Sequence, residues 1–435
     1  METLPIEILM KIFSYLEFSD IIWTTPQVCK LWKSVAADQS MVKALEVDDE
    51  YSVFDLKLCH IAVKRYKLIT HFKLIFHGYD GNSAKKIFIN NIIRELAQNC
   101  SYLLDLSLTD CSRDQFQEAI EILLMNCFKI QKLSLIYVPL PSIESFSKLQ
   151  SLETLDLEFS GNFEAGRIAS ALPKSSFRLK SIGIYFHDGQ TIASDCYKII
   201  NHSKCTLKTL CFMDPASEIF HVISECCELE KLILKTRYIR TIRDENWLKI
   251  TALKKLKMLR IGYTTDMSPT IFKKILINPN LSNLKILSIA WENNDYSLPQ
   301  FQTIIGNTSP NIVVLEIDST SRLLPLLGLD VILSKCRKLV ILDVRNVYNK
   351  PEELAEIVDF DNLPPNLKIM DIMMDDFEKI EYISELDSVK KLHKNSFFKE
   401  MSYSELRSTL AGVEPEVFQL AYDWFEMKKE YERYF

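Results

Sequence analysis

The stretch LLDLSLTDC, residues 103–111, decides the fold, because it fits the pattern LxxLxLxxC and the same frame returns along most of the chain. The frame occurs twelve times, and most steps between copies are 27 or 28 residues, with two steps of 22. Chance spacing of leucines would not keep one frame over that length. The central apolar residue of each copy is, in order, Phe72, Leu106, Leu133, Leu155, Ile182, Leu210, Leu232, Leu259, Leu287, Leu315, Leu342 and Met370.

A repeat of this pattern, with a period of roughly 20 to 29 residues, resembles the leucine-rich repeats, here of the cysteine-containing type over about residues 60–380. Each copy predicts a short strand whose leucines point into the core while the intervening residues face the concave side. The segments between strands, such as residues 113–127, carry apolar residues at helical spacing. The predicted fold class is therefore α/β, a curved solenoid with a parallel concave sheet and helices on its convex side.

Composition limits the function classes. The chain has 435 residues, 47% of them hydrophobic, and a net charge of −6 with basic residues scattered along it, so we expect no nucleic-acid partner. No apolar run reaches the roughly 18 residues that cross a bilayer, and acidic Glu2 and Glu7 argue against a signal peptide. We expect a cytoplasmic or nuclear protein that does not bind membranes.

The eleven cysteines are expected to be reduced thiols, since no secretory signal precedes them. Five of them precede the first leucine of a copy by two or three residues, where helix turns into strand: Cys100, Cys127, Cys205, Cys227 and Cys336. A small, soft hydrophobic side chain packs well at such a corner. We favour packing over a reactive or metal-binding role, and no spacing in the chain predicts a metal site.

The N-terminal stretch LPIEILMKIFSYL, residues 4–16, carries too much apolar surface for an isolated amphipathic helix. Its apolar residues cover an arc of roughly 240° on a helical wheel, whereas an amphipathic surface helix needs a stripe of little more than about 100°. Further along, Thr25 is expected to cap a third helix that starts at Pro26. The excess arc leaves two explanations, packing on the first repeats as an N-terminal cap or cover by a partner.

This stretch, with VCKLW at 28–32 and DQSMVKAL at 38–45, resembles an F-box over residues 3–45. The resemblance implies a three-helix domain that docks onto a Skp-type adaptor and, through it, onto a cullin ubiquitin ligase. In that family, repeats behind the F-box commonly hold the substrate. The adaptor-binding residues implied here are Leu4, Pro5, Ile8, Leu9, Ile12, Phe13, Leu16, Val28, Cys29 and Trp32.

Side chains on the predicted concave face form a candidate substrate-binding surface. Aromatic and arginine side chains are typical anchors of protein interfaces, and Lys235 and Arg260 would suit an acidic or phosphorylated segment. The alternative is that the aromatic rings partly cover one another. The candidate residues are Phe159, Tyr185, Phe186, Met213, Lys235, Arg260, Tyr263 and Trp291.

The predicted organisation is an F-box at 1–46, a linker helix at 47–67, about twelve repeats at 68–375 and a helical C-terminal cap at 376–435. No catalytic motif or cofactor-binding motif is found, so we expect no catalytic residue and no cofactor. Two hypotheses remain: a non-catalytic substrate receptor of a Skp/cullin/F-box ubiquitin ligase, or a leucine-rich-repeat scaffold or inhibitor that binds a protein partner without ligase assembly.

Overall fold

The computed structural model describes thirteen segments of the chain: residues 4–48, 50–76, 83–111, 114–138, 141–159, 177–186, 193–235, 242–262, 267–291, 298–319, 329–345, 363–372 and 403–432. Two compact units divide the chain at Leu207 and Lys208, and each is described by itself. No helix in the described segments is both long and apolar enough to cross a membrane.

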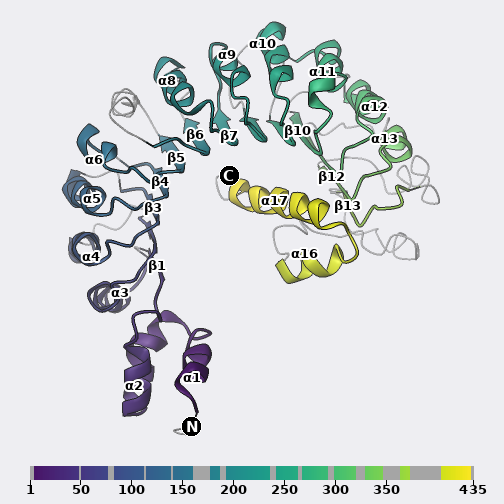
Figure 1. The fold of residues 1–435 in the computed structure, drawn as a ribbon. Helices are drawn as coiled ribbons and strands as arrows, with labels where there is room; N and C mark the ends of the chain where they lie inside the picture. Colours follow the sequence, from purple (N-terminus) through teal and green to yellow (C-terminus); the bar gives the residue numbers. More distant parts are fainter. Residues whose placement is uncertain are drawn as a thin grey trace. The chain divides into compact units, whose positions relative to one another are not determined.

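The first unit begins with short helices and continues with strands that alternate with helices (Figure 1). Its elements are α1 (Ile6–Phe13), the π-helix η1 (Asp20–Thr24), the 3-10 helix η2 (Thr25–Gln27), α2 (Lys30–Ala36), β1 (Ala44–Asp48), α3 (Val53–Arg65), β2 (His71–Ile75), α4 (Ser83–Asn99), β3 (Asp105–Thr109), α5 (Asp114–Asn126), β4 (Lys132–Ile136), α6 (Ile143–Ser147), β5 (Thr154–Phe159), β6 (Ser181–Phe186) and α8 (Ala193–Ser203).

Strands β1 to β6 are parallel and pair in sequence order, with no gap in register. The predicted leucine frame forms one row across them: Leu45, Phe72, Leu106, Leu133, Leu155 and Ile182, all at most 4% exposed. The strand β1 was not predicted. It spans the predicted domain boundary at residue 46, so the first rung of the sheet directly follows the N-terminal helices.

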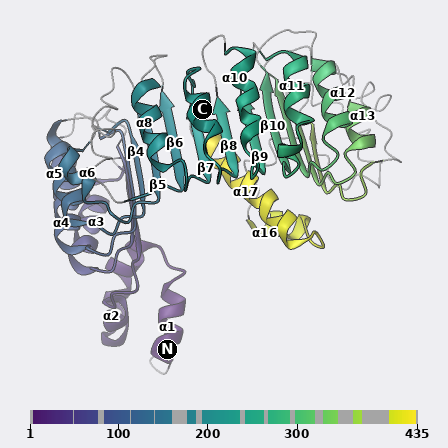
Figure 2. The same ribbon diagram turned by 45° about the horizontal axis from the view of Figure 1, so that its top comes forward.

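The second unit repeats this plan (Figure 2). Its elements are β7 (Thr209–Met213), α9 (Ile219–Ser224), β8 (Lys231–Lys235), α10 (Asp244–Leu248), the 3-10 helix η4 (Lys249–Ala252), β9 (Met258–Gly262), α11 (Pro269–Leu276), the 3-10 helix η5 (Pro279–Leu281), β10 (Ile286–Trp291), α12 (Leu298–Thr308), β11 (Val314–Ser319), α13 (Leu329–Lys335), β12 (Ile341–Arg345), β13 (Ile369–Ile372), α16 (Tyr403–Thr409) and α17 (Pro415–Glu432).

Strands β7 to β13 are also parallel and in register. Their leucine row runs Leu210, Leu232, Leu259, Leu287, Leu315, Leu342 and Met370, again almost fully buried. Parallel strands joined by helical return segments place the helices on one face of the sheet. The predicted fold class is confirmed, and we call the face opposite the helices the inner face.

The cysteine prediction holds at three of the five corners. Cys100, Cys127 and Cys336 are fully buried, and the Sγ of Cys127 donates to the carbonyl oxygen of Cys100, in the preceding repeat, at 3.5 Å. For Cys205 and Cys227 the prediction is wrong, because both are exposed. In the second case the adjacent Cys226 is the buried residue, since it lies five positions before its strand, as Cys100 and Cys127 do.

Candidate protein-interaction surfaces

Helix α1 closes the N-terminal helical module with one of its faces. Leu9 and Phe13 are completely buried, and the ring of Phe13 meets the ring of Trp32 on α2 edge to face, with 5.0 Å between centroids. The sulfur of Cys29 accepts the backbone N–H of Trp32 at 3.5 Å and so caps α2. This face of α1 forms the small core of the module.

The rest of the apolar arc of α1 points outward. Ile6, Ile8 and Ile12 keep 52%, 48% and 43% of their surface exposed, and Tyr15 just after the helix keeps 76%. Val28 is 55% exposed. A group of exposed apolar side chains on one small module is typical of a protein-interaction site, whereas single ones are not. We call these five residues the outward apolar surface.

The middle of the module differs from the prediction that Pro26 starts a third helix. The π-helix η1 runs directly into the 3-10 helix η2 over residues 20–27, and the next α-helix, α2, begins only at Lys30. The hydroxyl of Thr25 is buried and donates to the carbonyl of Ile21 at 2.9 Å, and the N-cap of the following α-helix is Cys29 instead. Pro26 fits because the first positions of a helix need no N–H donor.

The module is fastened to the first repeat by polar contacts. The hydroxyl of Tyr66, at the end of α3, donates to the carbonyl of Ala36 at the end of α2. The side chain of Gln39 donates to the carbonyl of Arg65 at 2.8 Å and accepts the backbone N–H of Lys67 at 2.6 Å. The module therefore contacts the first repeat through Ala36 and Gln39, while its outward apolar surface stays exposed.

The inner face of the second unit is covered by its own C-terminal helices. The first residues of five successive strands are apolar and buried: Met258, Ile286, Val314, Ile341 and Ile369. Leu406 and Leu410 of α16 and the Ala421, Trp424 and Phe425 side chains of α17 pack in the same cluster. The predicted helical C-terminal cap thus lies along the strands β9 to β13.

A buried polar network joins α17 to this inner face. One carboxylate oxygen of Glu316 accepts from the hydroxyl of Ser288 at 2.6 Å and from the indole N–H of Trp424 at 3.3 Å. The Arg260 guanidinium lies 3.5 Å from the other oxygen. The ammonium of Lys428 pairs with Asp343 and lies 3.9 Å from Glu316. Charges this deeply buried are tolerated only when they are paired.

A family model described as F-box-like matches residues 1–45. Residues 1–45 are an F-box-like domain. The F-box-like domain and the leucine rows that follow it in the chain together confirm the resemblance predicted from the sequence motifs.

No curated protein matches the chain in sequence. Among solved structures, an internalin (inlF) from Listeria monocytogenes str. 4b F2365 has a TM-score of 0.35 and 14% identity, over 87% of this chain and 94% of that chain. A chain in the structure of the Rad7 and Elc1 complex in yeast has a TM-score of 0.45 and 12% identity, over 85% of this chain and 88% of that chain.

Within the F-box-like domain, the ten residues predicted to contact an adaptor fall into three groups. Leu9 and Phe13 belong to the domain's core. Pro5, Ile8, Ile12 and Val28 are exposed, and Leu4, Leu16, Cys29 and Trp32 are half-buried. The prediction omitted three exposed side chains, Ile6, Tyr15 and Trp23, although the helical wheel already placed Ile6 on the apolar arc of α1.

The residues predicted to bind a substrate are not gathered on one open face. Met213, Lys235 and Arg260 are at most 5% exposed. Tyr185 on β6 is half-buried. Tyr263 lies outside the described residues, and so do the side chains of Phe159, Phe186 and Trp291, whose backbones belong to β5, β6 and β10.

The inner face of the first unit differs in being polar. The first positions of β3 to β6 are Asp105, Lys132, Thr154 and Ser181, all partly exposed. On β2, the Lys73 ammonium pairs with Glu46 of β1 at 2.8 Å, and both side chains are exposed. These first strand positions are polar, so they do not need to be buried under a helix.

The described residues offer no obvious catalytic or metal centre. No group of three or more His, Cys, Asp or Glu side chains in the described segments could hold a metal ion. Burial raises the pKa of the Cys59, Cys100 and Cys127 thiols to about 12 and that of Cys336 to about 11. A thiol with so high a pKa is a poor nucleophile near neutral pH.

Proposed function

We propose that the protein is a substrate-recognition subunit of a Skp/cullin/F-box ubiquitin ligase. In this role the F-box-like domain binds a Skp-type adaptor, and through it a cullin, while the repeats hold a protein target. The observation that carries the proposal is the outward apolar surface, which lies on and beside α1 of a domain that matches the F-box-like family. The domain's own core leaves Ile8 and Ile12 about half exposed, as a docking face requires.

The proposed contribution of the protein is proximity and not chemistry. A receptor that holds a target near a ubiquitin-charged enzyme raises the effective concentration of the reacting groups without touching them. The proposal therefore needs neither a catalytic residue nor a cofactor in this chain. It implies that the protein acts in the cytoplasm or the nucleus.

We propose that the target protein binds to the inner face of the first unit and not along the full concave surface. The C-terminal helices cover the apolar positions of β9 to β13, and Arg260 is already paired with Glu316. The strands β5 and β6, with Tyr185 on β6, belong to the unit whose first strand positions are polar and partly exposed. Tyr185, which stands between two residues of the leucine parity on β6, stays in the proposed target surface.

The test is co-purification of the full chain with a Skp-type adaptor. Ile8→Asp combined with Ile12→Asp places two charges on the outward apolar surface and should abolish adaptor recovery, since burying an unpaired carboxylate is costly. The control is Ile87→Asp, which changes a 61% exposed isoleucine on α4 and should leave recovery unchanged. Adaptor recovery that survives the double substitution, or that is absent in the unaltered chain, would refute the proposal.

The scaffold or inhibitor hypothesis has one observation in its favour, the fastening of the domain to the first repeat through Tyr66 and Gln39. A domain that only capped the repeats would make these contacts as well. It would not require that Ile8 and Ile12 be exposed. The double substitution therefore separates the two hypotheses, because it leaves the capping contacts intact.

A further inference from the structure

The sequence carries an unusual local excess of positive charge that the function proposed above does not use. Between residues 204 and 285 there are 15 lysines and arginines against 8 aspartates and glutamates, in a chain whose net charge is −6. In the linear sequence these lysines look scattered. The repeat brings a group of them to the edge of the second unit where helices end and strands begin. We call this group the basic edge: Lys208, Lys254, Lys255, Lys257, Lys273, Lys274 and Lys285.

The repeat explains the alignment. Lys208, Glu230, Lys257 and Lys285 each stand directly before a strand, β7 to β10 in order. The backbone N–H of each one donates to the carbonyl of the previous one at 2.8 Å, so the four residues are consecutive rungs of one ladder. Neighbouring rungs in a sheet are about 4.8 Å apart. Charges that are 22 to 28 residues apart in sequence thus become neighbours in space.

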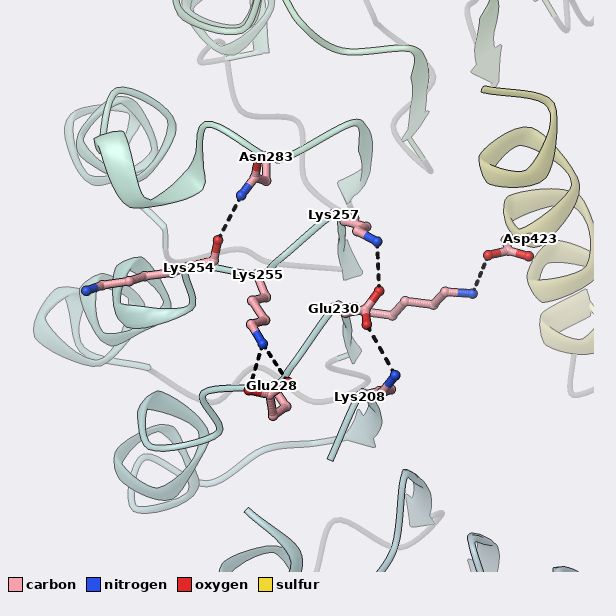
Figure 3. Close-up of polar contacts among 9 residues, drawn as sticks. Lys208, Glu228, Glu230, Lys254, Lys255, Lys257, Asn283 and Asp423 are labelled. Atoms are coloured by element: carbon pink, nitrogen blue, oxygen red, sulfur yellow. Dashed lines mark hydrogen bonds and ion pairs between the residues drawn. The ribbon is translucent and has the colours of Figure 1, made fainter. Parts of the chain in front are cut away.

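The carboxylates of this edge are already neutralised (Figure 3). Glu230 is shared by Lys208 at 3.7 Å and Lys257 at 2.9 Å, and the hydrogen bond from Lys257 lowers the pKa of that carboxyl. Glu228 accepts from Lys255 at 2.6 Å. Asp423 of α17, which faces the edge, is paired with Lys231 at 2.7 Å.

A surplus of lysines remains. Lys254, Lys273 and Lys274 are exposed and Lys285 is half exposed, and in the described part of the chain none has a carboxylate within ion-pair distance. Figure 3 shows the Lys254 side chain pointing away from Glu228 and Glu230. Its carbonyl accepts the amide of Asn283 at 3.1 Å, which fixes the turn that carries it. The surplus positive charge therefore sits on an ordered turn and in the last turn of α11.

We propose that the basic edge binds an acidic segment of the target protein. The inference rests on the proposed function only in naming the bound protein as the ligase target. An extended chain rises about 3.3 Å per residue, so carboxylates spaced along it can meet lysines on successive rungs. In the sequence, Lys235 and Arg260 suggested a binding site for an acidic segment, but both side chains are buried. We therefore place this binding site on the basic edge.

Two observations favour an acidic peptide over nucleic acid. Binding of single strands relies on exposed aromatic rings on which bases stack. Among the described residues of the second unit, Ile277 is the one large apolar side chain that is highly exposed, and it has no ring. The cations on the edge are all lysines, which act as point charges, whereas specific phosphate recognition favours the bidentate fork of arginine.

The test measures binding of a fluorescein-labelled peptide of alternating glutamate and serine to the full chain at low salt, by fluorescence anisotropy. Lys254→Glu, Lys273→Glu and Lys274→Glu together should weaken binding by about tenfold, because three exposed lysines that pair with peptide carboxylates are replaced by side chains that repel them. The matched control makes the same charge change at exposed lysines of the first unit, Lys43→Glu, Lys67→Glu and Lys148→Glu. It should bind as the unaltered chain does.

Three results would overturn the inference: no binding of the peptide to the unaltered chain, equal weakening in both triple variants, or equally tight and equally sensitive binding of a single-stranded DNA of the same charge. Adaptor co-purification is run on the same variants. Normal adaptor recovery with lost peptide binding supports the basic edge. Lost adaptor recovery in the unaltered chain, with peptide binding retained, defeats only the proposed ligase role.

Discussion

At the scale of single residues, the buried pair of Lys428 and Asp343 makes the sharpest stability prediction. Replacing Lys428 by Met leaves the carboxylate of Asp343 buried without its cation, and such a break costs about 3 to 5 kcal/mol. Urea unfolding of the Lys428→Met variant should show this loss. The control, Lys64→Met, removes a surface pair with Glu95 at 3.3 Å and should cost no more than about 1 kcal/mol. Equal effects would show that the network adds nothing beyond a surface contact.

The corner cysteines make a residue-scale prediction about pH. The thiols of Cys100 and Cys127 ionise at a pKa of about 12 in the fold, against an ordinary 9.0. The unfolded chain loses these protons first, so their contribution is complete below about pH 9 and is lost as pH rises toward about 12. In the Cys100→Ala and Cys127→Ala double variant, the free energy of unfolding should fall less steeply above about pH 9. An unchanged slope would contradict this origin.

The same cysteines show what a single sequence can and cannot resolve at this scale. The leucine frame predicted the buried corner at Cys100, Cys127 and Cys336, since position in the repeat determines burial. It did not separate Cys226 from Cys227, because a shift of one residue in the turn exchanges the buried and exposed side chains. A thiol-labelling reagent should accordingly modify Cys205 and Cys227 in the folded chain and leave Cys100 unmodified until the chain unfolds.

At the scale of elements, the leucine frame predicted every strand from β2 to β13, because inward leucines at a fixed period are what a solenoid core requires. It did not predict that α17 covers strands as far back in the chain as β9. The signal was present in the first strand position, which changes from polar in Asp105, Lys132 and Thr154 to apolar in Met258 and its successors. An apolar inner face must be buried against another segment. The sequence pattern does not say which segment that is, because the contact joins residues that are distant in the chain.

The change from polar to apolar residues at the first strand position predicts which substitutions weaken the packing of α17 on the inner face. Val314→Thr with Ile341→Thr gives two inner-face positions the polar character of Thr154 and Ser181, and leaves the leucine row untouched. Burying two hydroxyls without partners weakens the docking of α17 by about 1 to 3 kcal/mol each. Amide hydrogen exchange should speed up in residues 415–432 with little change in β11 and β12. Faster exchange across all strands would show that the helix and the sheet are one cooperative unit.

At the scale of the whole molecule, the sequence predicted an F-box followed by leucine-rich repeats. The structure shows that the N-terminal domain both contacts the first repeat and exposes an apolar surface. The F-box-like domain matches by pattern, so its place at the start of the chain was predictable from LPIEILMKIFSYL. The division of α1 into a core face with Phe13 and an outward face with Ile8 was not predictable from the sequence. Both residues are apolar, and a helical wheel does not show which side of α1 packs against α2. Tertiary packing decides that, and it makes Phe13→Ala a stability variant before it is a docking variant.

This dual attachment predicts that deleting the domain and blocking its surface have different consequences. Removing residues 1–45 cuts into β1 and takes away the partner of Tyr66, so the edge of β2 and a buried hydroxyl are left uncovered. The truncated chain should unfold at a lower temperature and form aggregates on size exclusion. Ile8→Asp with Ile12→Asp should keep the unfolding temperature and monomeric elution of the unaltered chain while losing the adaptor. A truncated chain as stable as the full one would mean that the domain is an independent appendage, and that the fastening through Tyr66 and Gln39 adds nothing to the repeats.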